Sequence, residues 1–234
     1  EAIAVDLGAA GYGRVRIENY QGYPATLVRE IVFVKQGGVV VKDTLSLGQE
    51  LKMRWGQVFR ARNLGPDRGP NWINTYTGPW MPLRGLGRGA PVYTRWRNSP
   101  RDLLIYFLPD RHGRLELVDE SGRDSTLPLP LRVQYTLRQD GKPDTPLSSV
   151  SLLVPHAPGT AGPLAEGVRV LLSEPARTVV EFPDTDGTRN LVVLNPSGRP
   201  LKLDGLKTDA RVACIRHSRG KVSAVSLYEG KELS

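Results

Sequence analysis

The 234-residue chain has 32 Lys and Arg against 24 Asp and Glu, a net charge of +8, with 25 Gly, 19 Pro and a single Cys. One cysteine excludes both an intramolecular disulfide and a thiolate zinc site, and its apolar setting predicts that Cys214 is a buried, inert thiol. No stretch approaches the roughly 18 apolar residues that a membrane-spanning helix needs, and the chain starts without a secretory signal. The start would also suit a domain excised from a longer protein.

Short runs rich in Val, Leu and Thr recur along the whole chain and are bounded by Gly, Pro, Asp and Asn, which is typical of a β-sandwich or barrel. The expected strands are residues 14–18, 28–34, 39–43, 51–60, 92–97, 102–108, 114–118, 131–138, 149–154, 168–173, 178–182, 190–194, 212–216 and 222–227. Gly-containing pairs such as Arg219-Gly220 separate these runs, as antiparallel hairpins require. We predict an all-β fold with very little helix: one large two-sheet antiparallel β-sandwich domain over residues 1–234.

One stretch interrupts this rhythm. Eleven of the 28 residues from Leu64 to Pro91 are Gly or Pro, which predicts a long loop. Side chains such as Trp72 and Trp80 give it more apolar mass than disordered segments have. We therefore expect an ordered, Gly/Pro/Trp-rich loop that folds over one end or face of the sandwich, where binding residues usually lie.

All four tryptophans lie in residues 52–101, here called the Trp/Arg segment, which holds ten Lys and Arg against one acid, Asp67. Aromatic faces stack on sugars or bases, and Arg binds carboxylate, sulfate or phosphate through two hydrogen bonds. Trp55 and Trp96 fall in strand-like runs and suit core packing equally well, whereas Trp72 and Trp80 suit an exposed platform. The predicted ligand-binding residues are Trp55, Arg68, Trp72, Tyr76, Trp80, Arg84, Arg88, Arg95, Trp96 and Arg97.

Residues for catalysis or metal binding are scarce. His112, His156 and His217 occur in no ligand spacing and are expected to be solvated structural residues. Asp184 and Asp186 alternate as in a calcium loop, but the closing glutamate is missing, so a plain turn is the favoured interpretation over a cation site. We predict no catalytic residue, no metal and no cofactor for the chain alone.

Four runs, Arg29–Thr44, Trp96–Phe107, Ser151–His156 and Val225–Leu233, resemble the C-terminal β-sandwich of heparinase II/III-like polysaccharide lyases. In that family an α/α toroid, which has no counterpart here, carries the catalytic tyrosine and most of the substrate cleft. Asp43 matches the aspartate that binds a metal in the sandwich, but the histidines that accompany it are missing. The resemblance therefore implies a sandwich domain without an active site of its own.

Three functions remain open. The leading hypothesis is a secreted or periplasmic, carbohydrate-associated domain that binds an anionic polysaccharide through the Trp/Arg segment and is accessory to a lyase-like enzyme. The alternative is a protein-docking sandwich whose Trp/Arg surface packs on the missing catalytic toroid. Nucleic-acid binding ranks third, because basic aromatic surfaces suit single strands but no nucleic-acid motif accompanies this one. No membrane partner is expected.

Overall fold

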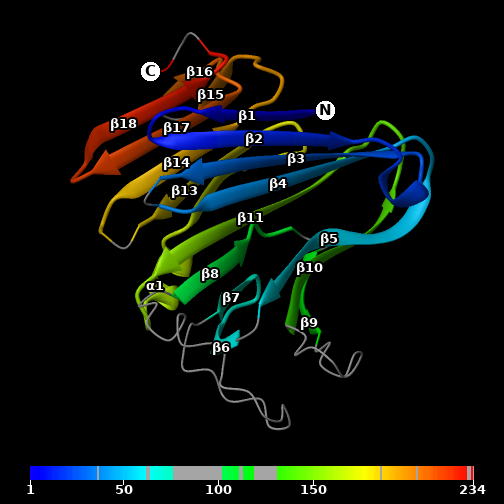
Figure 1. Cartoon of the computed structure of the whole chain (residues 1–234), viewed down its shortest axis with the longest axis horizontal. Coiled ribbons are helices and arrows are strands. Elements are labelled where there is room, and N and C mark those ends of the chain that lie inside the picture. Colours follow the sequence, from blue (N-terminus) through cyan, green and yellow to red (C-terminus); the bar gives the residue numbers. More distant parts are fainter. Residues whose placement is uncertain are drawn as a thin grey trace, which may run out of the picture.

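A computed structural model describes residues 1–35, 37–61, 64–75, 102–110, 113–118, 131–184, 186–203, 205–230 and Leu233. Within these residues the chain forms eighteen strands and two short helices, η1 (Tyr20–Gly22) and α1 (Ala161–Glu166). The prediction of an all-β fold with very little helix is confirmed (Figure 1). In the described ranges no helix has both the length and the apolar character needed to cross a bilayer.

The strands pair into four antiparallel sheets. Sheet A has the order β1-β2-β3-β4-β11-β8-β7-β6, sheet B β5-β10-β9, sheet C β12-β13-β14-β17-β18 and sheet D β15-β16. The bounds are β1 (Ala2–Asp6), β2 (Ala10–Ile17), β3 (Ala25–Val34), β4 (Val39–Leu47), β5 (Leu51–Ala61), β6 (Leu64–Arg68), β7 (Trp72–Thr75), β8 (Asp102–Phe107), β9 (Gly113–Val118), β10 (Leu131–Gly141), β11 (Leu147–His156), β12 (Arg169–Ser173), β13 (Thr178–Pro183), β14 (Arg189–Leu194), β15 (Leu201–Leu203), β16 (Leu206–Thr208), β17 (Val212–Ser218) and β18 (Lys221–Tyr228).

Thirteen of the fourteen predicted strands overlap these elements, and the other one, 92–97, lies outside the described residues. The predicted loop 64–91 needs a correction at its start, because β6 and β7 are strands. Pairing with β8 and a hydrogen bond from the Gly69 amide to the Trp72 carbonyl (2.9 Å) outweigh the local Gly and Pro content there. Residues 76–91 of that loop lie outside the described part.

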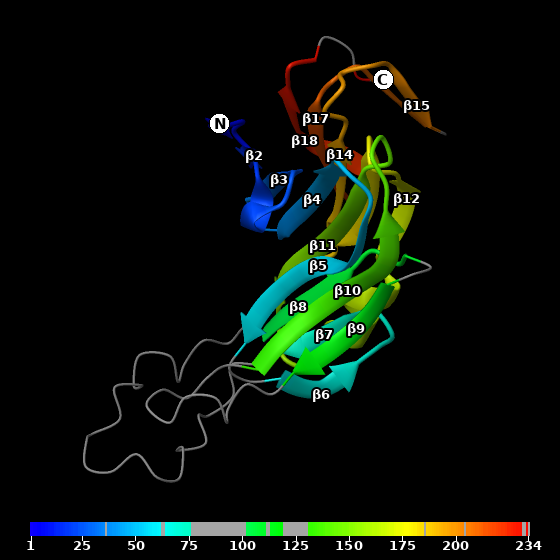
Figure 2. The same ribbon diagram turned by 90° about the vertical axis from the view of Figure 1, so that its right-hand side faces the viewer.

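Sheet A is the middle layer of the sandwich. In β3 the buried face changes along the strand: Leu27 faces sheet B, whereas Val32 and Val34, on the opposite face, contact sheet C. Successive strand residues point to opposite faces, so one long strand serves two cores. The predicted sandwich is confirmed, with three packed sheets (A, B and C) and the small sheet D where two sheets were expected, and Figure 2 shows sheet B lying over the β7–β8 end of sheet A.

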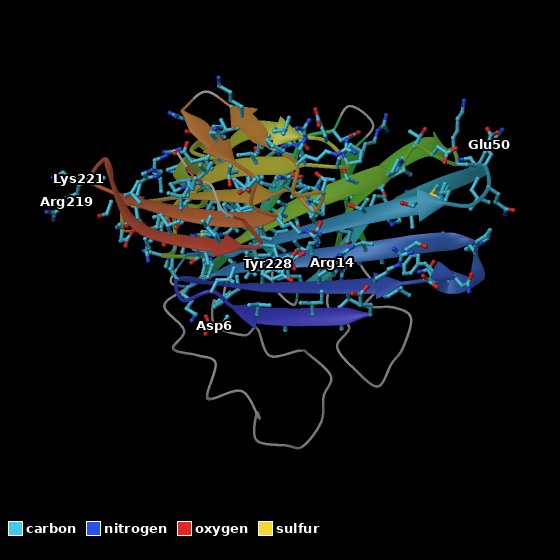
Figure 3. The ribbon with its side chains drawn as sticks, turned by 90° about the horizontal axis from the view of Figure 1, so that it is seen from above. Asp6, Arg14, Glu50, Arg219, Lys221 and Tyr228 are labelled. Carbon is cyan, nitrogen blue, oxygen red and sulfur yellow. The ribbon has the colours of Figure 1, made fainter. Side chains whose placement is uncertain are left out.

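The core between sheets A and C closes where β18 meets the first two strands. The Tyr12 and Tyr228 rings lie 5.1 Å apart, and Ser226 Oγ donates a hydrogen bond to the Leu7 carbonyl (2.8 Å). Figure 3 shows Tyr228 beside Arg14 at this edge. Cys214 lies in the same core, where burial raises the pKa of its thiol to about 11, in agreement with the predicted inert cysteine.

Candidate functional site

Trp55 and Trp72, the two tryptophans of the described residues, lie on opposite faces of sheet A. Trp55, on β5, is only 9% exposed and belongs to the core between sheets A and B. Trp72, on β7, pairs with Tyr106 and packs half-buried against the core between sheets A and C. The structure therefore does not bring these two side chains together on one surface.

Arg68 is exposed at the end of β6, close to Trp72 through the pairing of Arg68 with Ile73. β7 ends at Thr75 and β8 begins at Asp102, and these two strands pair, with Thr75 opposite Leu103. The other predicted ligand-binding residues lie outside the described part of the chain: Tyr76, Trp80, Arg84, Arg88, Arg95, Trp96 and Arg97.

A chain of hydrogen-bonded polar side chains joins β7, β8 and β11. The Asn74 amide donates from Nδ2 to Asp102 Oδ2 (3.3 Å) and accepts a hydrogen bond at Oδ1 from His156 Nε2 (3.0 Å). His156 Nδ1 lies 2.7 Å from the Ala157 carbonyl oxygen and 3.1 Å from Thr160 Oγ1. These hydrogen bonds fix β7, β8 and β11 to one another where β7 ends and β8 begins.

His156 is fully buried, which corrects the prediction of a solvated residue. Both ring nitrogens have hydrogen-bond partners within the protein, so the ring organises its surroundings and does not reach a substrate. His217 is half-buried at the end of β17, and His112 lies outside the described residues.

The loop with Asp184 and Asp186 forms a turn closed by an arginine. Arg216 Nη2 lies 3.5 Å from Asp184 Oδ2 and 3.1 Å from Asp186 Oδ2, so a guanidinium occupies the position where a cation would sit between the carboxylates. Hydrogen bonds from the hydroxyl and amide of Thr188 lower the pKa of Asp186. No group of three potential metal ligands occurs in the part of the chain that the structure describes.

Asp43, the residue matched by resemblance to a metal ligand, forms a two-pronged ion pair. Arg29 Nε and Nη2 donate to Asp43 Oδ1 and Oδ2, each at 2.7 Å. The Asp43 side chain is only 4% exposed, and hydrogen bonding to it raises the pKa of Arg29. Both carboxylate oxygens are thus committed to the arginine on the neighbouring strand.

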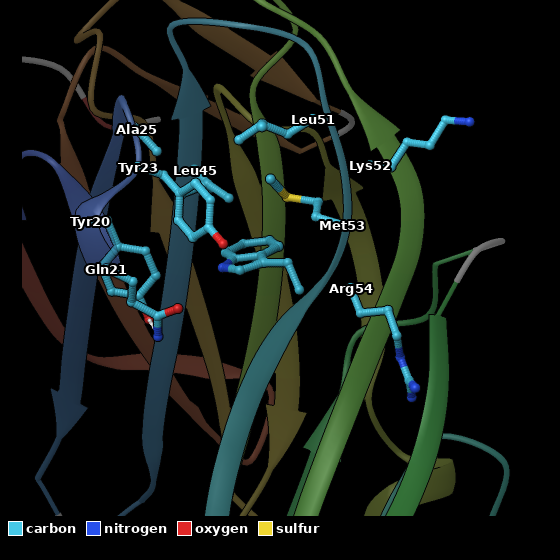
Figure 4. Close-up of a pocket in the computed structure, with 10 residues that line it drawn as sticks. Tyr20, Gln21, Tyr23, Ala25, Leu45, Leu51, Lys52, Met53 and Arg54 are labelled. Atoms are coloured by element: carbon cyan, nitrogen blue, oxygen red, sulfur yellow. Dashed lines mark hydrogen bonds between the residues drawn. The ribbon is translucent and has the colours of Figure 1, made fainter.

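A pocket that the sequence analysis did not anticipate opens between η1, the start of β3, the end of β4 and the start of β5 (Figure 4). Its volume is about 310 Å³. The lining residues are Tyr20, Gln21, Tyr23, Ala25, Leu45, Leu51, Lys52, Met53, Arg54 and Trp55. Two closely spaced tyrosines in the sequence were an available signal, but only the packing of sheet B on sheet A places them beside Trp55.

The turn that carries the tyrosines is fixed by its backbone. The Tyr23 amide donates to the Tyr20 carbonyl (3.1 Å), and Gly22 donates to Asn19 (3.0 Å). Asn19 and Gln21 adopt left-handed conformations, with φ of 51° and 55°, which are unfavourable for residues other than glycine. Such backbone conformations concentrate at binding sites, where the surrounding structure holds them in place.

Strand alternation decides which side chains of β5 face this pocket. Leu51 and Met53 point into it, whereas Lys52 and Arg54 point away, as Figure 4 shows. Arg54 Nη2 also donates to both carboxylate oxygens of Glu116, at 2.9 and 2.7 Å. The inner wall of the pocket is therefore aromatic and aliphatic, with the basic groups turned outward.

Comparison with known proteins places the fold. No protein-family model matches the sequence, and no curated protein is similar to it. A structure of a heparinase III shares the fold with a TM-score of 0.52 and 9% identity over 83% of this chain. The heparan sulfate lyase HepC from Pedobacter heparinus gives a TM-score of 0.50 and 14% identity, also over 83%. This chain spans 28% of the length of each of them, so the resemblance to the heparinase sandwich holds at the level of the fold.

Proposed function

We propose that the chain is an accessory β-sandwich of a polysaccharide-lyase-like enzyme, which holds an anionic polysaccharide through the Trp/Arg segment and is not catalytic alone. The observation that carries this proposal is the similarity of fold to a heparinase III and to a heparan sulfate lyase. A sandwich that covers a minor part of each lyase suits an accessory role. Since such polysaccharides lie outside cells, the proposal includes a secreted or periplasmic location.

The charge of the Trp/Arg segment supports the same function. It contains ten basic residues and one acid, whereas the rest of the chain is almost neutral. Arginine forks bind sulfate and carboxylate groups of a polysaccharide, and aromatic rings pack on its sugar faces. Within the segment, Arg68 is exposed at the end of β6 and Trp72 is half-buried at the start of β7.

The contacts of one histidine and three aspartates outside the Trp/Arg segment support a non-catalytic role. His156 is buried with both ring nitrogens bonded, and Asp43 is bound by Arg29. Asp184 and Asp186 share Arg216. These polar side chains are therefore bonded to other groups of the protein and serve the fold.

Affinity electrophoresis of the purified chain in gels containing heparan sulfate, a neutral polysaccharide or single-stranded DNA tests the proposal. We expect retardation by heparan sulfate alone, weakening with salt as ionic contacts are screened. The double variant Arg84→Ala/Arg88→Ala should lose this retardation. Arg199→Ala/Lys202→Ala removes the same charge from exposed positions near sheet D and serves as the matched control. Equal retardation of both variants, or stronger binding to DNA, contradicts the proposal.

Docking of a catalytic domain is the second candidate, and an exposed apolar row favours it. Val15, Ile17, Ile31 and Phe33 lie on one face of β2 and β3 beyond the area covered by sheet B, and Phe33 is 50% exposed. Exposed apolar side chains gathered on one face, here with Arg29 opposite Val15 among them, mark interaction sites. These exposed residues are on β2 and β3, at the opposite end of sheet A from β6 and β7. Sedimentation of the wild type and Phe33→Lys decides it: concentration-dependent association that the variant loses is the expected result.

A further inference from the structure

We propose that the pocket around Tyr20, Tyr23 and Trp55, to which the Trp/Arg segment contributes only its first residues, is a binding site for an uncharged pyranose sugar that does not use Arg84 or Arg88. The inference does not rest on anionic polysaccharide binding by that segment. It rests on the ring composition of the pocket, its uncharged inner wall and its rigid frame.

The first argument concerns the aromatic rings. Tyr23 is 54% exposed at the mouth of the pocket, whereas Trp55 is almost completely buried in its wall. Tyr20 packs partly against the core between sheets A and B, but Tyr23 belongs to none of the core clusters. A tyrosine ring held open to solvent beside a second aromatic presents the flat apolar surface on which the C–H face of a pyranose packs.

The second argument concerns hydrogen bonding. Tyr20 and Gln21 lie side by side on one wall of the pocket in Figure 4, and Gln21 Nε2 donates to Tyr20 Oη (3.3 Å). Phenol and carboxamide groups can each donate and accept, which suits sugar hydroxyls, since every hydroxyl does both. A few polar groups in a mostly apolar pocket are the usual composition of small-molecule sites.

The third argument concerns charge and size. Lys52 and Arg54 point away from the interior, and Arg54 is bound to Glu116. Of the lining residues only Lys52 and Arg54 are charged, and both turn their charged ends outward, so an uncharged ring suits this pocket better than a sulfated one. A volume of about 310 Å³ is at the lower end of small-molecule sites, which range over about 300–1,000 Å³, and matches one or two sugar rings.

The fourth argument concerns rigidity. The Ala25 amide donates to the Tyr23 carbonyl (2.7 Å), and the Gly48 amide donates to the Pro24 carbonyl (2.7 Å). The second bond ties the end of β4 to the turn that bears Tyr23. A Cβ on Gly48 would lie only 3.0 Å from the Pro24 oxygen, so glycine permits this close approach. Because the frame is fixed before binding, little ordering entropy opposes the ligand.

The test uses the full chain and three uncharged probes: cellohexaose, maltohexaose and chitohexaose. Each is titrated by tryptophan fluorescence and by saturation-transfer NMR in about 1 M salt, where the Debye length is about 3 Å and ionic binding is suppressed. We expect saturable binding of at least one probe. Tyr23→Ala should weaken it about tenfold, a loss of about 1.4 kcal/mol, while Tyr23→Phe, which keeps the ring, should stay within about threefold of the wild type.

Phe33→Ala is the matched control, because Phe33 is an aromatic residue of similar exposure on another part of sheet A. It should leave binding unchanged, as should Arg84→Ala/Arg88→Ala, which separates this site from the proposed contacts of Arg84 and Arg88 with an anionic polysaccharide. Tyr23 is an exposed residue, and circular dichroism checks that its variants fold. The inference is overturned if no probe saturates, if Tyr23→Ala binds like the wild type, or if Phe33→Ala loses affinity equally.

Discussion

The imidazole of His156 and the carboxamide of Asn74 are 82 residues apart in the sequence and 3.0 Å apart in the structure. Their hydrogen bond connects the end of β11 with the end of β7. Asp102, the first residue of β8, accepts from the same Asn74 side chain (3.3 Å). Three buried polar side chains, those of His156, Asn74 and Asp102, thus hold β11, β7 and β8 together.

From these hydrogen bonds we predict how much stability the protein loses when His156 is replaced. His156→Ala removes a fully buried ring and leaves Asn74 Oδ1 without its bond, so we expect a loss of about 2–3 kcal/mol in the free energy of unfolding. Urea denaturation of the two proteins measures it. His217→Ala, at a half-buried strand end, should cost less than about 1 kcal/mol. Equal losses in both variants would refute the structural role assigned to His156.

Lys42 predicts a pH dependence of stability. It is fully buried, with Nζ donating to the Glu174 carbonyl (3.3 Å), and burial lowers its pKa from 10.5 to about 8. Between about pH 8 and 10.5 the unfolded chain therefore binds more protons at this residue than the folded chain, so its contribution to stability rises with pH. The stability advantage of the wild type over Lys42→Met should grow across this window, by at most about 3 kcal/mol.

Chemical denaturation of both proteins at the two ends of the window checks this prediction. Comparing the variants cancels the opposing effects of Tyr12 and Cys214, whose pKa values burial raises. A difference in stability that stays constant with pH, or shrinks, would show that Lys42 does not titrate as proposed.

From the position of Arg216 we predict that calcium does not change the thermal stability of the protein. Its guanidinium already lies between Asp184 and Asp186, at 3.5 and 3.1 Å, and a bound cation would have to displace it. Addition of Ca²⁺ or of a chelator should leave the thermal midpoint unchanged to within about 1 °C, since a ligand stabilises only through binding to the folded state. Differential scanning calorimetry gives the answer, and a saturable rise with Ca²⁺ would restore the cation site.

Cys214 predicts slow thiol chemistry in the native state. Its pKa of about 11 leaves little thiolate at neutral pH, and its sulfur is covered by the core between sheets A and C. Iodoacetamide should leave the native protein almost unlabelled at pH 8 and should label it fully in urea, as mass spectrometry can quantify. Rapid labelling of the native chain would contradict its burial.

Most strands were predictable because their signal is local. Runs such as Val28–Val34 are rich in β-branched and aromatic residues, and a Gly pair follows them, a signal that a short window of sequence displays. β6 and β7 were missed because Gly and Pro residues within β6 and between the two strands favour turns locally, while β8 pairs with β7 and β7 with β6. The short β15 and β16 were missed because strands of three residues carry too little pattern to detect.

By itself the sequence determined the all-β class, the buried cysteine and the concentration of charge and tryptophan in residues 52–101. Only the tertiary structure decided that Trp55 and Trp72 face opposite sides of sheet A, and that Tyr23 joins Trp55 in one pocket. The physical reason is that side-chain alternation is set within a strand, whereas neighbours are set by pairing between distant strands and by the packing of one sheet on another. β4 and β11, for example, are adjacent in sheet A although about a hundred residues separate them.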